Sequence, residues 1–311
     1  MIAAYCSRPQ HLSVALRSAL AQRGAQIEVL IGDDSPDDRL RSLARDADAR
    51  LLYQHNQPAL GVARNHWALF TRARGEFIVV LNHDDWLAPD FVPTLLDALT
   101  RQPEAVLAFC DHWIIDTAGR RQSTETDANS RAWGRATLAP GLHRPFEQLL
   151  AAQTIPMAMG TMFRRAALPE LLPAHAGPAY DLWLTYLLAR DGRGAFYVPR
   201  RLSAWRSHPD NLTTGAGLPW LQGAAECWWA VARDPVFRDI RPTALAKAAD
   251  AYSACAVRAW RDGRRTACIG FALHSLRARF SRRGLAALLM LPWLPRSAEQ
   301  LRPGARTIAK A

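Results

Sequence analysis

The sequence contains two pairs of adjacent aspartates, whose residue type and spacing could serve to bind a metal ion. "GDDSPDD" places Asp33 beside Asp34, and "LNHDDWLAP" places Asp84 beside Asp85, directly after an apolar run. Adjacent carboxylates repel each other, so a neighbouring cation favours their charged forms. Among cations, Mg²⁺ typically combines one or two carboxylates with substrate phosphates. The alternative is a turn rich in Asp, because Asp side chains bond to nearby backbone groups.

The segments around these pairs alternate between short strands and helices. Apolar spacing and the position of prolines predict strands at 27–31, 50–53 and 77–81 and helices at 11–23, 37–47 and 61–74. This alternation predicts an α/β fold with a doubly wound, mostly parallel sheet that has helices on both faces. Ligands bind at the carboxyl ends of strands in such sheets. Since both acidic pairs follow a strand, we expect them on one edge of the sheet, in a site for a cation and a polar ligand.

Composition and charge restrict the class of protein. The chain has 311 residues, of which 49% are hydrophobic, as in a globular protein of one large or two modest domains. It has neither an apolar run long enough for a membrane span nor the pattern of a signal peptide, and its five cysteines form no close pair. We therefore expect a cytoplasmic protein without a zinc ribbon or disulfide framework.

The net charge of +11 is concentrated in the last third of the chain. Residues 220–311 carry 16 Lys or Arg against 6 Asp or Glu, whereas residues 1–219 are nearly balanced. Such asymmetry indicates an anionic partner, either nucleic acid or an acidic membrane surface. Solvated helices rich in arginine are the alternative interpretation.

Four segments together resemble family 2 glycosyltransferases. They are "AAYCSRPQHL" (3–12), "EVLIGDDSPDD" (28–38), "GVARNHWALFTRARGEFIVVLNHDDWLAPDFV" (61–92) and "YDLWLTYLLARDGRGAFYVP" (180–199). The resemblance spans roughly residues 1–213, in the family's order and spacing. It implies the GT-A fold, a nucleotide-diphosphate sugar donor such as a UDP-sugar, a divalent cation (Mn²⁺ or Mg²⁺) and inversion at the anomeric carbon. We expect a catalytic domain at 1–219, with a nucleotide-sugar half at about 1–115 and an acceptor half at about 116–219.

The resemblance implies a donor-binding role for five residues. Tyr5 resembles the aromatic residue that packs on the donor base. Ala3 lies in the strand before it, where the family commonly has a proline, which leaves the polar contacts of this turn open. Asp34, with Asp33 beside it, resembles the acid that reads the edge of the base. Arg64, in "GVARN", resembles the basic residue that opens a helix near the nucleotide.

Four further residues are implied in the reaction. Asp84 matches the acid near the ribose and metal, and Asp85 matches a direct metal ligand. His208 falls in "WRSHPDNLT" (205–213), a segment that resembles the end of the domain, near the phosphates or the metal. Asp181 falls where the family keeps its catalytic base.

The chemistry of sugar transfer independently agrees with these roles. A diphosphate leaving group carries negative charge that a divalent cation stabilises, and a carboxylate must take the proton of the acceptor hydroxyl. The expected acceptor is a glycan or a lipid-linked molecule in the synthesis of a cell-surface polysaccharide.

Two other functions are weighed against this one. A sugar-nucleotide nucleotidyltransferase also uses an α/β sheet and a metal, but it would need a glycine-rich phosphate loop after the first strand, and "AAYCSRPQ" contains no glycine. A nucleic-acid-binding protein is indicated by charge alone, without basic motifs interleaved with aromatic residues, so we expect no nucleic-acid partner.

The basic region at 220–311 predicts helices at about 219–233, 242–261 and 265–281. It continues in "RRGLAALLMLPWLPR" (282–296), which is apolar, carries a tryptophan and is flanked by arginines. This segment is too short to span a bilayer, but it suits the interface of an anionic membrane. We therefore expect peripheral binding to the inner face of the plasma membrane. A core helix that docks on the catalytic domain is the alternative.

Overall fold

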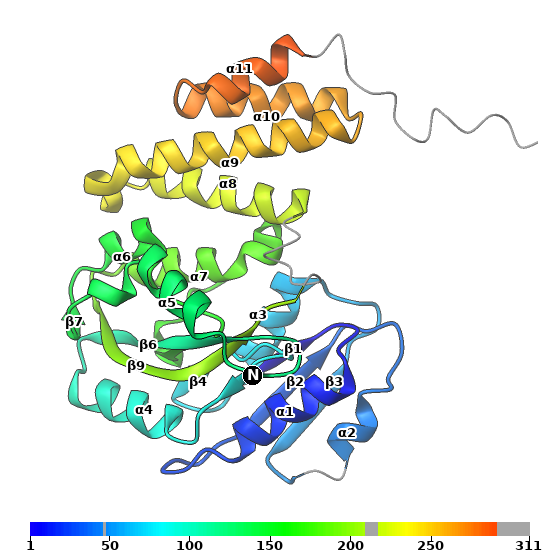
Figure 1. Cartoon of the computed structure of the whole chain (residues 1–311), viewed down its shortest axis with the longest axis vertical. Coiled ribbons are helices and arrows are strands. Elements are labelled where there is room, and N and C mark those ends of the chain that lie inside the picture. Colours follow the sequence, from blue (N-terminus) through cyan, green and yellow to red (C-terminus); the bar gives the residue numbers. More distant parts are fainter. Residues whose placement is uncertain (46–47, 209–216, 291–311) are drawn as a thin grey trace, which may run out of the picture. The chain divides into compact units, whose positions relative to one another are not determined.

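The computed structural model describes residues 1–45, 48–208 and 217–290 (Figure 1). It divides the chain into two compact units, residues 1–215 and 216–311. The sequence placed a domain boundary near residue 219; the catalytic role assigned to the first unit stays a prediction. Among the described helices, none is both long and apolar enough to cross a membrane.

Three parallel strands begin the first unit. Strands β1 (Ile2–Ala4), β2 (Val29–Asp33) and β3 (Leu51–His55) pair in that order, and β4 (Phe77–Val79) runs beside β1. Two backbone hydrogen bonds join β1 to the β4 segment, from Met1 N to Val79 O at 2.8 Å and from Leu81 N to Met1 O at 3.0 Å. The predicted α/β class and its parallel strands are therefore confirmed.

The sheet continues through β4 into a mixed part that the sequence did not predict. Its order is β4-β8-β6-β9-β5, and β7 also pairs with β9. The bounds are β5 (Trp86–Leu87), β6 (Ala105–Ile115), β7 (Gly141–His143), β8 (Thr161–Arg164) and β9 (Gly194–Arg206). Strands β6 and β9 are parallel, whereas β5 and β7 pair antiparallel with β9, and β8 with β4 and β6. The long strand β9 thus reaches from β7 to the acidic turn between β4 and β5.

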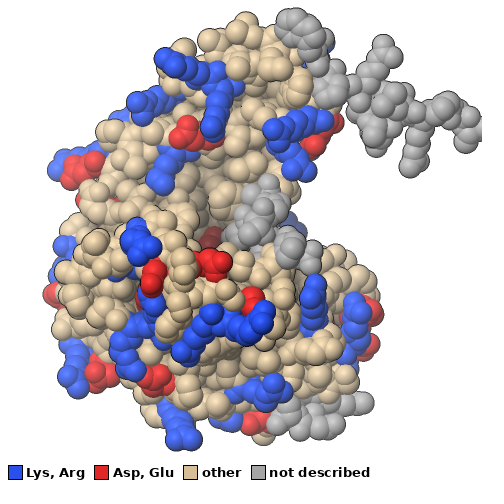
Figure 2. Space-filling model, in the orientation of Figure 1, with Lys and Arg blue, Asp and Glu red and all other residues tan. Residues whose placement is uncertain are grey.

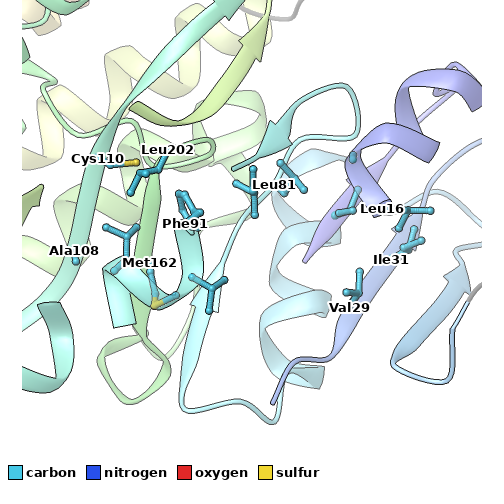
Figure 3. Packing of buried hydrophobic residues seen from close by; sticks show 14 of the residues in the cluster. Leu16, Val29, Ile31, Leu81, Phe91, Ala108, Cys110, Met162 and Leu202 are labelled. Atoms are coloured by element: carbon cyan, nitrogen blue, oxygen red, sulfur yellow. The ribbon is translucent and has the colours of Figure 1, made fainter. Parts of the chain in front are cut away.

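Helices cover both faces of this sheet. They are α1 (Pro9–Leu20), α2 (Arg41–Arg45), α3 (Val62–Arg72), α4 (Phe91–Arg101), α5 (Ser123–Ala132), α6 (Glu147–Ala152) and α7 (Tyr180–Ala189), with short 3₁₀ turns η1 (Arg135–Thr137), η2 (Arg165–Ala167) and η3 (Ala174–Ala179). Leu16 of α1 and Phe91 of α4 share one core with Met162 of β8 (Figure 3). Phe70 of α3 meets Phe163 edge-on, with ring centroids 5.8 Å apart. Because adjacent residues of a strand point to opposite faces, α3 lies on the other face of the sheet.

The second unit is helical. It contains α8 (Leu218–Arg233), the 3₁₀ turn η4 (Pro235–Ile240), α9 (Arg241–Arg261), α10 (Arg265–Ala278) and α11 (Arg282–Leu289). Small buried side chains, including Ala256, Cys268 and Ala287, form the core between the last three helices. The three predicted helices are confirmed, and residues 291–296 of the predicted membrane segment lie outside the described residues.

Candidate active site

Asp33, at the end of β2, is fully buried and held by two protein donors. Its Oδ1 accepts a hydrogen bond from Ser35 N at 2.9 Å, and its Oδ2 accepts one from the Tyr53 hydroxyl at 2.7 Å. Burial and the hydrogen bond to Asp33 raise the pKa of Tyr53, so this hydroxyl stays protonated as a donor. Asp33 therefore ties the ends of two neighbouring strands together, and its role in binding the sugar nucleotide stays a prediction.

Asp34 holds the loop that precedes α3. Its Oδ1 accepts from Asn56 Nδ2 at 2.9 Å and from Leu60 N at 3.1 Å, and its Oδ2 accepts from Gly61 N at 2.8 Å. Gly61 is the residue before α3 and has φ +81°, which suits glycine. The carboxylate thus positions the start of the helix that carries Arg64. Its predicted role in reading the base stays a prediction.

Two donor-side residues predicted from the sequence are open to solvent. Tyr5 follows β1 with 62% of its surface exposed, and Arg64 is exposed in the first turn of α3. Ala3 is half-buried inside β1, in register with Gly32 of β2. Tyr5 and Arg64 are therefore accessible to a ligand at this edge, with an aromatic face and a positive charge respectively.

Asp85 lies in the turn between β4 and β5 and is fully buried. Its Oδ1 accepts from Arg206 N at 2.7 Å, and its Oδ2 accepts from Asn82 Nδ2 at 2.8 Å. Burial and then the charge of neighbouring Asp84 raise the pKa of Asp85 well above its ordinary value, although these two hydrogen bonds oppose the shift. A cation beside this turn would oppose the shift and favour the ionised form of Asp85.

His208 meets the other acid of this turn. The distance from His208 Nε2 to Asp84 Oδ2 is 2.8 Å. The structure therefore brings two of the three proposed metal ligands, Asp84 and His208, into direct contact, beside Asp85 in the same turn. Whether they bind a metal stays a prediction.

Arg206 is a site residue that sequence reasoning missed. It ends β9 and is 4% exposed, and its Nε donates to Asp84 O at 2.8 Å. Its Nη1 donates to Asp116 O at 3.1 Å and to Thr117 O at 3.2 Å. The signal was present in the sequence, because Arg206 stands two positions before the proposed ligand His208.

The imidazole of His11, on α1, interacts electrostatically with the same turn. Burial lowers the pKa of His11, the charges of Arg206 and Arg8 lower it further, and the charge of Asp84 opposes them. These interactions place His11 in electrostatic range of the acidic turn. The sequence offered no separate signal for this, because His11 is one of nine histidines.

Asp181 lies in the first turn of α7, where its Oδ1 accepts from Leu182 N at 2.8 Å. Amide groups at the N-terminus of a helix favour the ionised form of a carboxyl group. The amide contact is present, but burial outweighs it and raises the pKa of this half-buried carboxyl. A raised pKa makes the carboxylate a stronger base once it is ionised.

Tyr180 links Asp181 to the acidic turn. Its ring stacks on His66 of α3, with centroids 3.7 Å apart and planes at 21°. Burial, then the charge of Asp181, then the charge of Asp85 raise the pKa of its hydroxyl. Asp181 and Asp85 therefore act on the same side chain, which places the proposed base and the proposed metal ligand in one region of the first unit.

The donor set of the acidic turn fits a hard divalent cation. Asp84 and Asp85 offer carboxylate oxygens, and burial followed by the charge of Asp84 raises the pKa of Asp85, so a cation beside it would favour its ionised form. Within the described part of the chain, no group of three or more His, Cys, Asp or Glu side chains is arranged to hold a metal ion. This suits a site that supplies one or two carboxylates and leaves the other positions to phosphate oxygens.

A cavity of about 620 Å³ lies elsewhere in the first unit, over β6 and β9. Its lining includes Asp111, whose Oδ1 accepts from Arg135 Nε at 2.7 Å and whose Oδ2 accepts from Ser130 Oγ at 2.5 Å. Trp113 also lines it, with the Arg201 guanidinium 4.8 Å from the ring centroid. None of the acids at positions 84, 85 and 181 lines this cavity, so its polar groups belong to a separate buried network.

Residues 1–172 match the sequence model of the family described as Glycosyl transferase family 2. The chain belongs to this family. Within it, the putative glycosyltransferase EpsH of Bacillus subtilis is 30% identical over 117 residues, which is 36% of this chain and 33% of EpsH. Protein MT1568 of Mycobacterium tuberculosis is 39% identical over 84 residues, which is 26% of this chain and 25% of that protein. The matched stretches thus cover a third or less of these curated relatives.

Solved structures with the same fold include two glycosyltransferases. Staphylococcus aureus TarS in complex with UDP-GlcNAc superimposes with a TM-score of 0.60 at 11% identity, over 93% of this chain and 89% of that chain. The mannosyltransferase PcManGT from Pyrobaculum calidifontis, in complex with GDP-Man and Mn²⁺, gives 0.55 at 15% identity over 94% and 86%. These similarities confirm the predicted GT-A fold of this family member.

Proposed function

We propose that the first unit transfers a sugar, with inversion, from a nucleotide-diphosphate donor to a hydroxyl of a glycan or lipid-linked acceptor. The observation that carries the proposal is the acidic turn, where Asp84 contacts His208, together with Asp181 in the first turn of α7, next to Tyr180, which stacks on His66 of α3. Family membership supports it, as do the donors named with the two solved structures. UDP-sugars are the donors that we test first.

The proposed reaction is a single displacement. The acceptor hydroxyl oxygen forms a bond to the anomeric carbon, and the bond from that carbon to the diphosphate oxygen breaks, with its electron pair leaving on the diphosphate. Asp181 takes the proton of the hydroxyl, because its carboxylate is a strong enough base to accept it. One displacement inverts the anomeric configuration, so no second catalytic carboxylate is required.

The donor is proposed to lie along the edge of the sheet. Tyr5 packs on the base, Arg64 approaches the phosphates, and Asp84 faces the ribose. A divalent cation held by Asp85 and Asp84, with His208 beside them, would supply positive charge to the leaving diphosphate. Arg206 positions both acids, because its backbone N–H donates to Asp85 Oδ1 and its Nε donates to the carbonyl oxygen of Asp84.

We further propose that the acceptor belongs to cell-surface polysaccharide synthesis and that the enzyme works on the cytoplasmic side of the membrane. The basic second unit supports a location beside an anionic surface, since it holds most of the net positive charge of the chain. This location would bring the first unit to lipid-linked acceptors.

Calorimetry with UDP, UDP-GlcNAc and GDP-mannose, each with and without Mn²⁺, tests the donor. We expect one nucleotide to bind, and to bind more tightly with Mn²⁺. Product analysis then separates transfer from nucleotidyl chemistry: a transferase releases nucleoside diphosphate from the sugar nucleotide, whereas a nucleotidyltransferase exchanges pyrophosphate. If none of these nucleotides binds in either condition, the proposed donor class is wrong.

A further inference from the structure

We propose that α10 and α11 of the second unit form a membrane-binding face for anionic phospholipid, which we call the α10–α11 face. It comprises the exposed apolar side chains Leu273, Phe280, Leu285, Leu289 and Met290 and the exposed arginines Arg277, Arg279, Arg282 and Arg283. The proposal goes beyond sugar transfer and does not depend on it.

Exposed large apolar side chains are concentrated on α10, α11 and the connection between them. Ten are exposed among the described residues, and five of them lie within residues 273–290. The exposed fraction is 69% for Phe280, 65% for Leu289 and 55% for Leu273. Single exposed apolar residues are ordinary, but a contiguous group rimmed by polar residues marks an interaction surface.

The packing of α11 explains why these side chains point outward. Gly284 lies against Ser275 of α10, where an added Cβ would come within 3.0 Å of the Ser275 hydroxyl oxygen. Ala287 is buried in the core of the unit, and the Trp260 indole donates to Met290 O at 2.9 Å. Since Gly284 and Ala287 face inward, the positions of Leu285 and Leu289 are left on the outer side of the helix.

Arginines lie beside the apolar residues on each helix. Arg277 follows Leu273 by four positions on α10, and Arg282 precedes Leu285 by three positions on α11, so each pair shares a helix face. Arg279 stands next to Phe280 in the connection between the helices. Long arginine side chains can place their charge among lipid phosphates while their methylene stems cover apolar surface.

The positive charge of α10, α11 and the residues around them indicates which kind of surface they bind. Between Asp262 and Glu299 the sequence contains seven arginines and no acidic residue. Figure 2 shows several blue side chains and a smaller number of red ones on the tan surface of the helical unit. Apolar side chains accompanied only by positive charge are complementary to a surface that combines an apolar interior with negatively charged headgroups, namely an anionic bilayer. A nucleic acid would meet the charge but would leave the exposed leucines and Phe280 in water.

The test is cosedimentation of the full chain, without any nucleotide, with vesicles of phosphatidylglycerol and phosphatidylcholine and with vesicles of phosphatidylcholine alone. We expect binding to the acidic vesicles at low salt, much weaker binding at high salt, and little binding to the neutral vesicles. Two variants address the two components: Arg282→Gln with Arg283→Gln, and Leu285→Ser with Leu289→Ser. Each arginine contributes roughly fivefold to the partition coefficient, so the arginine variant should bind about 25-fold more weakly.

A matched control comes from the same unit. Val236→Ser with Arg238→Gln removes one exposed apolar and one exposed basic side chain from η4, and it should bind like the wild type. Circular dichroism and thermal unfolding check that all variants keep the fold, which we expect because every substituted residue is exposed. No binding of the wild type to acidic vesicles at low salt would overturn the proposal, and so would equal losses in the control and in the α10–α11 variants. Retention of duplex RNA that acidic vesicles fail to displace would overturn it in favour of nucleic acid.

Discussion

The ends of β2 and β4 each carry two adjacent aspartates, yet the protein uses the two pairs differently. At the end of β2, both oxygens of Asp33 and both of Asp34 accept hydrogen bonds from neighbouring protein groups. At the end of β4, burial and mutual repulsion raise the pKa of Asp85, and Asp84 faces a histidine. The protein groups around the first pair bond all four of its carboxylate oxygens, whereas in the second pair only Asp85 has both oxygens bonded in this way and Asp84 contacts His208.

The difference comes from the donors that surround each pair, since the aspartates themselves are alike. The loop after β3 brings backbone amides of Leu60 and Gly61 to Asp34. The turn after β4 receives one backbone amide, from Arg206, and the side-chain amide of Asn82 for the fully buried carboxylate of Asp85. Two adjacent acids in a sequence therefore do not by themselves identify a metal site, because neighbouring protein groups can serve as their partners.

The largest expected effect is at the β4 end. Asp85→Ala removes the carboxylate that is proposed to hold the cation, so the metal-dependent part of nucleotide binding should disappear. Calorimetry of nucleoside diphosphate with and without Mn²⁺ measures it, and thermal unfolding should show a retained fold. Affinity that still rises with Mn²⁺ in this variant would make Asp85 a structural acid like those at the end of β2.

A slightly smaller loss is expected for the proposed base. Asp181→Asn keeps the shape of the side chain but removes its basicity, so turnover should fall by at least about 10²-fold while nucleotide affinity stays near that of the wild type. Sugar transfer to the acceptor and calorimetry report the two quantities separately. Near-normal turnover would assign Asp181 to the start of α7 alone.

The pH dependence follows from the raised pKa of Asp181. Because only the ionised form accepts a proton, wild-type turnover should decline as the pH falls through a value above the ordinary 3.8 of Asp. The folded state binds this proton more tightly than the unfolded state, so the group lowers stability once the pH rises above its unfolded pKa. Asp181→Asn should therefore be as stable as the wild type at neutral pH, or more stable, in chemical denaturation.

A substitution at the end of β2 should change the free energy of unfolding more than it changes nucleotide binding. Asp34→Ala leaves two backbone amides and the Asn56 amide without their acceptor, which should cost roughly 2–4 kcal/mol of unfolding free energy. Urea denaturation measures the loss. A variant that is as stable as the wild type, but no longer binds nucleotide, would show that Asp34 serves the ligand and would remove the contrast between the pairs.

The smallest effect is expected at Tyr53. Tyr53→Phe removes only the hydroxyl that donates to Asp33, so the unfolding free energy should fall by about 1–2 kcal/mol, with unchanged nucleotide affinity. The same denaturation series provides the measurement. A loss of nucleotide affinity in this variant would show that the contact between Tyr53 and Asp33 also supports nucleotide binding.

Local patterns explain which parts of the fold could be predicted. The strands β2, β3 and β4 are short apolar runs between helices with regular spacing, and each appears within a few residues of its predicted place. β9 was not predicted, because its middle, Arg200-Arg201, is polar and exposed or half-buried. Its pairing with β6 and β5 is set by the tertiary fold, which overrides local preference.

The sequence predicted which residues belong to the candidate site better than it predicted which residues contact one another. The proposed acids stand in recognisable motifs, whereas Arg206 binds Asp85 across 121 positions of the chain. Likewise, nothing near Asp34 in the sequence identifies Leu60 and Gly61 as its donors. Burial could not be predicted from the sequence either. The start of a helix at Asp181 was visible in the sequence, but the burial that raises the pKa of Asp181 was not.

Arg206 has a consequence for the thermodynamics of ligand binding. Strand ends ordinarily fray, yet this one is fastened by a guanidinium that donates to the carbonyls of Asp84, Asp116 and Thr117. The acidic turn is thereby ordered before any ligand arrives, and its conformational entropy has already been lost during folding. A ligand that binds there does not have to immobilise the turn, so more of its interaction energy is expressed as affinity.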